Sequence, residues 1–412
     1  MESSLETIKS RRAVPLTQDH LEVRRVVVIL SGSRGGSSLF KEALALHPRI
    51  ASLDGELEPL LALSGNGFNR NSDSDSLDQV ANATELASGV LDEISFASPR
   101  LLESSLLRRK WRNRLALQFP LHFLDAGAYR RLEQSLEAAL GRIDRADRRS
   151  DAELQGLILS AVFSEEPWRI SYYDGQVSRG AKRHFDEPLK IEEPPFVVPT
   201  LRRRPFAPAD AQDSVLLFKS PADAYRFGLY ERLFPNAEVS YIHLTRGYAQ
   251  SVNGLMDGWL YPLGFFSHDL SKIGCELAIQ GYSDRVSFGR KWWKFDLPRN
   301  WRRFTRAKLH EVCLNQWYSI HEAILDRGVA TLRVSFEDFI ASPAAALKQV
   351  TDHLGLPAVA LPGPLPLKMA TEPPYPRRWH KRGSMLMDLS RRPEVREMMG
   401  MLGYAMDSDT WL

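Results

Sequence analysis

The sequence predicts an α/β fold in which helices flank a parallel β-sheet. Three observations support this prediction. Short apolar runs rich in Val, Ile and Leu alternate with longer segments of helical periodicity, which is typical of parallel strands joined by helices. The first such run is followed directly by a glycine-rich loop and a helix. One long helical stretch then interrupts the alternation as an insertion.

The composition is that of a globular protein without a strong electrostatic preference. Hydrophobic residues make up 43% and charged residues 25% of the 412 positions, and a net charge of +3 is too small to indicate nucleic-acid binding. Cys275 and Cys313 form no CxxC pair, so we expect neither a zinc site nor a disulfide framework. The sequence has no apolar run of eighteen residues and no leader pattern, so we expect no membrane contact and a cytoplasmic location. It leaves the oligomeric state open.

The N-terminal part of the chain contains the strand, loop and helix unit. Residues 1–21 are polar and mixed, and we expect a loose N-terminal arm there. Residues 24–30 (RRVVVIL) predict a strand buried on both faces, and the helix that begins at Ser37 should end before Pro48. Residues 50–53 predict a short second strand.

The rest of the chain divides into an insertion and the second part of the core. Further strands are expected at 214–219, 238–245 and 330–336. We therefore expect one domain over 22–412, with a core made of 22–64 and 212–403. The insertion, 65–211, should begin with an exposed loop at 65–80, continue as helices over 81–165 and end in an irregular, proline-rich stretch at 186–210.

The loop after the first strand has the features of an anion site. A helix N-terminus presents free N–H groups and the positive end of the helix dipole, and glycines let the backbone curl around a phosphate or sulfate. Arg34 can add a fixed charge, and Ser37 and Ser38 can add hydroxyl donors. The loop also contains Ser33, Gly35 and Gly36. Gly36 stands where the P-loop of nucleoside triphosphatases has its lysine, so the unit is P-loop-like but not built for ATP hydrolysis. A plain glycine turn is the alternative.

The stretch 26–59 resembles the 5′-phosphosulfate loop of sulfotransferases, in particular the tyrosylprotein and bacterial broad group. Their pattern is a strand, then PRSGTT, then a helix that ends in HP, then a glutamate. This chain has SRGGSS, which keeps the arginine, the second glycine and two hydroxyls but lacks the proline and the first hydroxyl. The resemblance implies a P-loop-like sheet, the donor 3′-phosphoadenosine-5′-phosphosulfate (PAPS), its product 3′-phosphoadenosine-5′-phosphate (PAP), and no metal.

Two basic residues follow later predicted strands in the order that this family uses. Lys219 lies in Leu217-Phe218-Lys219-Ser220-Pro221, and Arg246 follows the strand that comes after Leu233-Phe234-Pro235. The resemblance implies that Lys219 reaches the oxygen bridging phosphate and sulfate, and that Arg246 binds the 3′-phosphate. Both lie at carboxyl ends of predicted strands, where open α/β sheets bind ligands. Each could instead be a solvated strand end or a surface ion pair.

The chain departs from the family at the 3′-phosphate site. Gly254 stands where the family has a serine, and Gly247 stands where it has an aspartate. Ser251 lies three residues before Gly254, and on a helix these positions share a face, so Ser251 could contact the same phosphate. A late basic segment of the family also contacts this phosphate. Arg382 and Gly383 would match it, with a solvated basic loop as the alternative.

Transfer to a hydroxyl or amine needs a base within hydrogen-bond reach of the nucleophile. In the resembled group this base is a glutamate after the HP turn, so Glu56 and Glu58 are the candidates. On an extended segment the two would point to opposite faces, and we slightly prefer Glu58. His184 and His268 are possible alternatives without support in the sequence.

The sequence therefore predicts a sulfotransferase that acts by in-line displacement on an acceptor capped by the insertion, with a small molecule as the expected partner. Arg34, Lys219 and one glutamate would take part in catalysis. The rival hypotheses are a P-loop-like nucleotide kinase and a non-catalytic nucleotide-binding protein of the same fold. His243 and the tryptophans Trp292, Trp293 and Trp301 are more typical of core than of a site. The basic run around Lys110 is more typical of a solvated helix face.

Overall fold

The fold is built on a seven-stranded, mostly parallel β-sheet with strand order β4-β3-β2-β5-β1-β6-β9. We describe it from a computed structural model over residues 2–12, 14–97, 103–144, 146–173, 189–194, 196–329, 331–366, 370–372 and 376–411. The strands are β1 (Arg25–Leu30), β2 (Ile50–Ser52), β3 (Ser95–Ala97), β4 (Arg203–Pro205), β5 (Val215–Lys219), β6 (Glu238–Thr245) and β9 (Thr331–Ser335). The five strands β2, β5, β1, β6 and β9 run parallel, which confirms the predicted α/β class.

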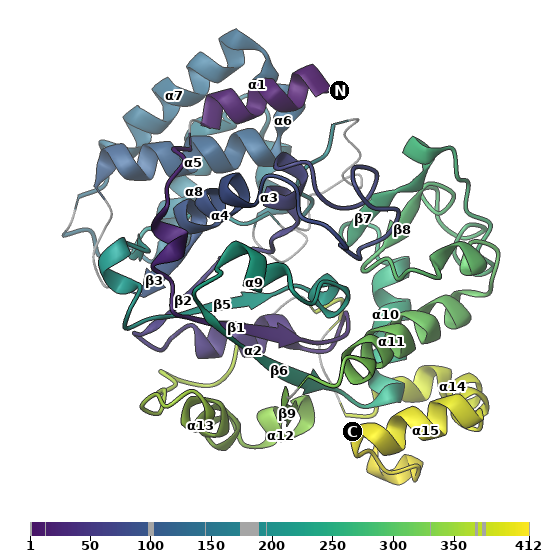
Figure 1. Cartoon of the computed structure of the whole chain (residues 1–412). Helices are drawn as coiled ribbons and strands as arrows, with labels where there is room; N and C mark the ends of the chain where they lie inside the picture. Colours follow the sequence, from purple (N-terminus) through teal and green to yellow (C-terminus); the bar gives the residue numbers. More distant parts are fainter. Residues whose placement is uncertain are drawn as a thin grey trace.

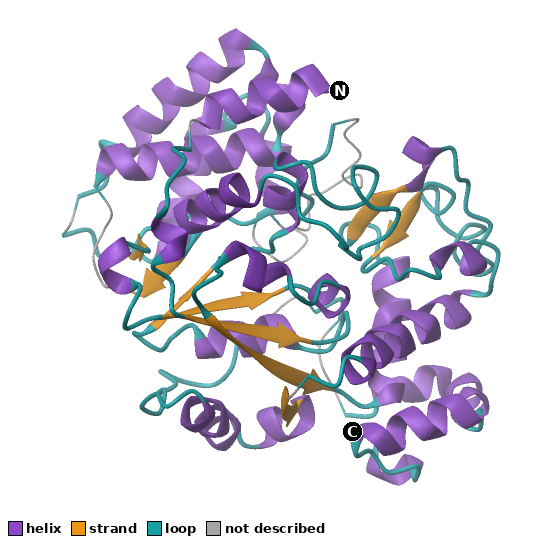
Figure 2. Ribbon diagram, viewed as in Figure 1, coloured by secondary structure: helices purple, strands orange, loops and turns teal. Residues whose placement is uncertain are grey.

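Helices cover both faces of the sheet (Figures 1 and 2). Alternate residues of the buried strand β1 point to opposite faces: Val26 and Val28 pack into one hydrophobic core, and Val27 and Ile29 into another. The first core is closed by α3 (Glu58–Leu63), α4 (Ala83–Glu93), α9 (Leu229–Leu233) and the end of α11 (Leu309–Asp326). The second is closed by α2 (Ser37–Leu44), α12 (Phe336–Ala341) and α13 (Pro343–His353).

A third core lies beside the sheet and holds most of the tryptophans. It is formed by α10 (Tyr248–Leu260), α11, α14 (Gly383–Ser390), α15 (Pro393–Leu402) and the small antiparallel pair β7 (Phe266–Asp269) and β8 (Trp292–Lys294). Trp292, Trp293 and Trp301 are fully buried in it, so they belong to the core. His243 on β6 is also fully buried, as predicted.

The insertion is mainly helical, as predicted, but it also extends the sheet. The helices α5 (Ser104–Gln118), α6 (Pro120–Leu124), α7 (Ala126–Leu140) and α8 (Asp151–Val162) enclose a hydrophobic core of their own. The strands β3 and β4 add an antiparallel pair to the edge formed by β2. Neither strand was predicted from the sequence, because each is only three residues long.

The N-terminal segment was expected to be a loose arm, and this expectation is wrong. Residues Glu2–Arg12 form helix α1, which packs on α5 and α6 (Figure 1). Ile8 is buried in the main core, and Arg12, which is 4% exposed, donates a hydrogen bond of 2.6 Å to Glu93. Lys9 also pairs with Glu85 at 3.1 Å, and the polar composition of the segment hid these apolar and ionic contacts.

Two further expectations about polar segments are also wrong. The loop at 65–80 is not simply exposed, because Asn66, Ser74, Asp75 and Leu77 are buried. Lys110 does not lie on a solvated face, since it is 8% exposed and donates to the Asp92 carbonyl. Within the part of the chain that the structure describes, no helix is both long and apolar enough to cross a membrane.

Candidate functional site

The predicted site residues come together at one edge of the sheet. The parallel strands β1, β2, β5 and β6 end at the same edge, where Lys219 is the last residue of β5 and the loops after the other three carry Arg34, Glu56 and Arg246. Crevices outside the carboxyl ends of parallel strands are where open α/β sheets bind ligands. The fold therefore places residues from four distant parts of the chain in one region.

The glycine loop between β1 and α2 is tightly curled. The Gly35 amide donates to the Gly32 carbonyl at 2.9 Å, and Gly36 caps α2 in the left-handed conformation (φ 87°). A Cβ at Gly36 would lie 2.1 Å from the Phe336 ring, so this position requires glycine for both its conformation and its contact. Ser37 and Ser38 begin α2, whose first turn leaves amide groups without partners inside the helix.

Three arginines surround this loop. The Arg246 guanidinium donates to the Arg34 carbonyl at 2.6 Å, and its Cζ lies 5.0 Å from the centre of the Phe336 ring. Burial, then the charges of Arg246 and Arg378, lower the pKa of Arg34 to about 10. Burial lowers the pKa of Arg246 as well. Glu337 opposes this shift, and Arg378 adds to it. Arg246 and Arg378 thus repel Arg34, Asp257 and Glu372 offset part of the charge of Arg378, and a bound anion would relieve the remaining repulsion.

Arg378 is a member of this cluster that the sequence analysis missed. It belongs to a short 3-10 helix, Arg378–Arg382, and pairs with Asp257 of α10 at 3.0 Å. Arg382, the predicted contact, also binds Asp257 (2.7 Å) and in addition Asn253. Gly383 begins α14 next to it. The basic segment does lie over α10, and the charge of Arg378, rather than that of Arg382, lowers the pKa of Arg34 and of Arg246.

The positions that depart from the family pattern lie on α10 beside the loop. A Cβ at Gly254 would lie 3.4 Å from the Arg34 Cβ, so the Arg34 side chain runs along the place where the family has its serine. Ser251, one turn earlier, is buried, and its hydroxyl donates to the Arg246 carbonyl at 3.4 Å. Ser251 therefore lies next to the backbone of Arg246, and its contact with a 3′-phosphate stays a prediction.

The two glutamates take part in two neighbouring ion pairs, Glu56 with Lys219 and Glu58 with Arg226. The Lys219 ammonium binds Glu56 at 2.5 Å, and Lys219 is 9% exposed while the Glu56 side chain is 44% exposed. Glu58 instead accepts hydrogen bonds from Ser220 (2.5 Å) and from the buried Arg226 (2.8 Å). The glutamates thus face different partners, although both lie beside the end of β5.

The pKa of Glu56 is raised above its ordinary value. Desolvation by the surrounding protein is the main cause, the Lys219 charge opposes it, and the Glu58 charge adds to it. A carboxylate with a raised pKa takes up a proton more readily, which suits a general base. Lys41 of α2 lies near Lys219. Burial lowers the pKa of Lys41 to about 8, and its ammonium donates to the carbonyl of Leu53, three residues before Glu56.

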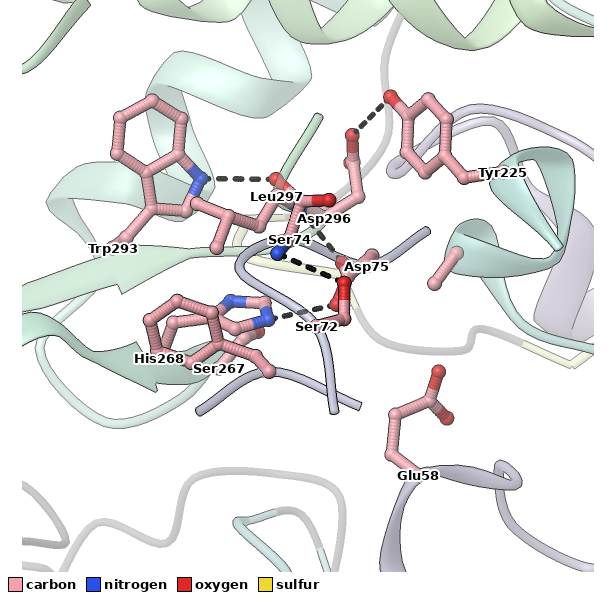
Figure 3. Close-up of polar contacts among 12 residues, drawn as sticks. Glu58, Ser72, Ser74, Asp75, Tyr225, Ser267, His268, Trp293, Asp296 and Leu297 are labelled. Carbon is pink, nitrogen blue, oxygen red and sulfur yellow. Dashed lines mark hydrogen bonds and ion pairs between the residues drawn. The ribbon is translucent and has the colours of Figure 1, made fainter. Parts of the chain in front are cut away.

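A buried polar network around Asp75 contacts Arg226, the partner of Glu58 (Figure 3). Asp75 accepts hydrogen bonds from the Leu297 amide (2.7 Å), interacts with His268 (2.9 Å) and lies 3.5 Å from Arg226. His268 is therefore held by a carboxylate, which the sequence could not show because Asp75 lies 193 positions away in a segment that looked exposed. His184, the other alternative base, lies outside the described residues.

The same network holds the side chain of Ser33. The Ser33 hydroxyl donates to Asp296 at 2.6 Å, and Tyr225 donates to the other Asp296 oxygen at 3.0 Å. Burial raises the pKa of Asp296 to about 7. Ser33 was predicted as a binding residue, and this bond leaves its backbone amide, rather than its hydroxyl, for an anion in the loop.

Metal-ligating side chains do not gather at this site. Among the described residues, no group of three or more His, Cys, Asp or Glu side chains is placed to hold a metal ion.

Comparison with known proteins gives little beyond this geometry. No family model and no curated protein matches the chain. Two solved structures that are similar to it are the sulfotransferase domain of the olefin synthase from Synechococcus PCC 7002 and the sulfotransferase STF1 from Mycobacterium tuberculosis H37Rv. The first has 12% identity and a TM-score of 0.29, with 94% of this chain and 87% of that chain covered. The second has 12% identity and a TM-score of 0.32, with 98% and 76% covered. At these TM-scores the function has to come from the site residues.

Proposed function

We propose that the protein is a sulfotransferase that moves a sulfuryl group from PAPS to a hydroxyl or amine of a small-molecule acceptor. The cluster of Arg34, Arg246 and Arg378 around the glycine loop carries this proposal. Three guanidinium groups that repel one another fit a ligand with two separated anionic groups, such as the phosphosulfate and the 3′-phosphate of PAPS. The loop 32–38 would hold the phosphosulfate, and Arg246 with Ser251 and Arg378 would hold the 3′-phosphate.

The reaction would be an in-line displacement at sulfur. The acceptor oxygen forms a bond to sulfur while the bond between sulfur and the bridging phosphate oxygen breaks, and PAP leaves with the electron pair. Lys219, which is nearly buried at the end of β5, would stabilise the charge that grows on that oxygen. Positioning and electrostatics would supply most of the rate enhancement, as in phosphoryl transfer.

Glu56 fits the role of base better than Glu58, which the sequence slightly favoured. Among the described residues Lys219 is the one partner of the Glu56 carboxylate, and the approach of Lys219 to the leaving phosphate would free the carboxylate and raise its pKa further. Glu58 accepts a hydrogen bond from Ser220 and pairs with the buried Arg226, so we expect its charge to stabilise the fold rather than to act in catalysis. The acceptor proton would therefore pass to Glu56.

The test is nucleotide binding measured by thermal unfolding. PAP at ~100 times its dissociation constant should stabilise the protein by about 2.7 kcal/mol. ATP with Mg²⁺ should stabilise it much less, and Arg246→Ala should remove the preference for PAP. The control, Arg290→Ala, changes an arginine whose side chain is 74% exposed and should keep the preference.

Two results would contradict the proposal. Stronger stabilisation by ATP with Mg²⁺, together with ATP turnover, would favour the P-loop-like kinase. PAP binding without sulfuryl transfer to any hydroxyl or amine of a broad panel would favour a non-catalytic nucleotide-binding protein.

A further inference from the structure

Asp296 is a buried acid that lies one hydrogen bond away from the glycine loop. It is 3% exposed and follows β8. Its carboxylate accepts hydrogen bonds from Ser33 of the loop at 2.6 Å and, as Figure 3 shows, from Tyr225 at 3.0 Å. Both partners are neutral hydroxyl groups, and among the described residues no basic side chain forms an ion pair with Asp296. Ionisation of this carboxyl therefore leaves a buried negative charge without a paired cation.

The groups around Asp296 do not make up for the missing cation. The charged residue with the largest effect on it is another acid, Asp75, whose own partners are Arg226 and His268. From α11, Cys313 also faces it, and burial raises the pKa of this thiol so that it stays neutral. Burial, to which the Asp75 charge adds, raises the pKa of Asp296 to about 7. The carboxyl therefore changes its charge near neutral pH.

The hydrogen bond to Ser33 connects this carboxyl to the candidate anion site. Ser33 belongs to the loop 32–38, so an anion held by the loop amides would lie close to Asp296, in an interior that screens charges poorly. A negative charge close to a carboxyl favours the protonated form of that carboxyl. Binding of an anion in the loop and ionisation of Asp296 therefore oppose each other.

We propose that Asp296 takes up a proton from solvent when PAPS or PAP binds, and that it is a positioning residue which makes the affinity for the nucleotide depend on pH. In this step the carboxylate becomes a carboxyl that keeps Ser33 and Tyr225 as its partners. This inference rests on the proposed function, because it takes the loop to hold the phosphosulfate. Above about pH 7 the free protein has lost this proton and binding has to restore it, so the affinity should fall as the pH rises.

The test counts protons during PAP binding. Calorimetric titration at pH 7.5 in two buffers of different ionisation enthalpy should show an uptake of ~0.5 proton or more per PAP, and the affinity should be about 4-fold weaker at pH 8.5 than at pH 7. The phosphates of PAP are already ionised in this range, because their second pKa lies near 6. Lys41, whose pKa is about 8, can take up protons as well, so the decisive quantity is the difference between the parent protein and a variant of Asp296.

Asp296→Asn is the decisive variant because it imitates the protonated carboxyl. Its amide can accept a hydrogen bond from Ser33 and donate one to Tyr225. It should take up ~0.5 fewer protons than the parent protein at pH 7.5 and bind PAP more tightly than the parent at pH 8.5. A merely structural role of Asp296 would instead weaken binding at every pH and leave the proton count unchanged.

Asp223→Asn is the matched control. Asp223 is 2% exposed, and burial raises its pKa to about 7 as well, but it accepts hydrogen bonds from the Ser220 amide (2.8 Å) and from Tyr230 (3.0 Å) rather than from the glycine loop. This variant should keep the proton uptake of the parent protein.

A further variant covers the case in which Asp296→Asn does not fold. Tyr225→Phe removes one hydrogen bond from the carboxylate, which raises the pKa of Asp296 and should move the proton uptake from pH 7.5 toward pH 8.5. Equal proton counts in the parent and in Asp296→Asn, loss of the uptake in Asp223→Asn, or no shift in Tyr225→Phe would each show that this inference is wrong. If PAP does not bind at all, the proposed function fails and this inference fails with it.

Discussion

Glu56 and Glu58 are two positions apart, yet their partners assign them different roles. Glu56 meets Lys219 at a half-exposed position, whereas Glu58 meets the buried Arg226. We expect Glu56→Gln to lower kcat by ~10²–10⁴-fold, the usual contribution of a general base, while the affinity for PAP stays within a few-fold. Steady-state kinetics and PAP titration would measure the two quantities.

Glu58→Gln is the matched control for this prediction. It removes the charge beside a guanidinium that is 2% exposed, so we expect a loss of thermal stability and a smaller loss of kcat. The opposite pattern, with kcat abolished by Glu58→Gln and preserved by Glu56→Gln, would return the role of base to Glu58.

His243 and His321 make stability depend on pH. Their ring nitrogens Nε2 and Nδ1 lie 3.0 Å apart in the core. Burial lowers the pKa of His243 to about 3, with a further effect of Arg333. Burial and then the His243 charge lower the pKa of His321 well below its ordinary value. Unfolded histidines titrate near pH 6.5, so the unfolded state binds more protons below that pH. Stability should therefore be complete above about pH 6.5 and fall as the pH drops toward 4.

A variant isolates this effect from other buried groups. The raised pKa values of Asp223 and Asp296, about 7 for each, act in the opposite direction in the same pH range, since burial disfavours their charged forms. His321→Gln stays neutral and can keep a hydrogen bond to His243. The difference in unfolding free energy between the protein and this variant should shrink by up to about 1.4 kcal/mol per pH unit below pH 6. Parallel curves from pH 7.5 to 4.5 would show that His321 does not titrate on unfolding.

At the scale of single site residues, the sequence could indicate positions but not partners. Arg34, Lys219 and Arg246 follow strands and glycine turns, and these local patterns predict that they reach the same edge of the sheet. The bonds of Ser33 to Asp296 and of His268 to Asp75 join segments that lie 263 and 193 positions apart. Such pairs follow from the tertiary fold, which local patterns do not contain.

At the scale of elements, the length and burial of a segment decided what could be predicted. The strand at 238–245 was predicted with the bounds that β6 has, because it is a long run that ends buried between β1 and β9. The three-residue strands β3 and β4 carry too few residues to show alternation, and they exist because β2 offers an open edge. Their pairing brings Ser95 and Arg203 to Asp54, in the same turn as Glu56.

The helix α1 shows the same limit for a polar segment. Its sequence, ESSLETIKSRR, has little apolar character, and an isolated helix of 11 residues is only marginally stable in water. It forms because Ile8 enters the main core and Arg12 meets Glu93, which is 10% exposed. Tertiary contacts, rather than helix propensity, therefore fix this element.

At the scale of the whole molecule, the insertion has its own core but is not independent of the sheet. Most buried residues of α5 to α8 form a separate core, but Leu117 of α5 is buried in the main core on the sheet. The links of the insertion to the rest are both apolar and polar: Leu86 and Val90 of α4 are buried in the main core, β3 pairs with β2, and Arg203 lies by Asp54. Unfolding the insertion alone would expose this apolar surface and leave Arg12 without Glu93 and Asp54 without Arg203, and an unpaired buried charge is costly.

We therefore expect the insertion and the sheet to unfold as one unit, and hydrogen exchange can test this. PAP bound at the glycine loop, at ~100 times its dissociation constant, stabilises the native state by about 2.7 kcal/mol and should slow exchange through global unfolding ~100-fold. If unfolding is cooperative, amides of α7 should slow as much as those of β1, although α7 belongs to the separate core. Slowing in β1 with unchanged exchange in α7 would mean that the insertion opens on its own.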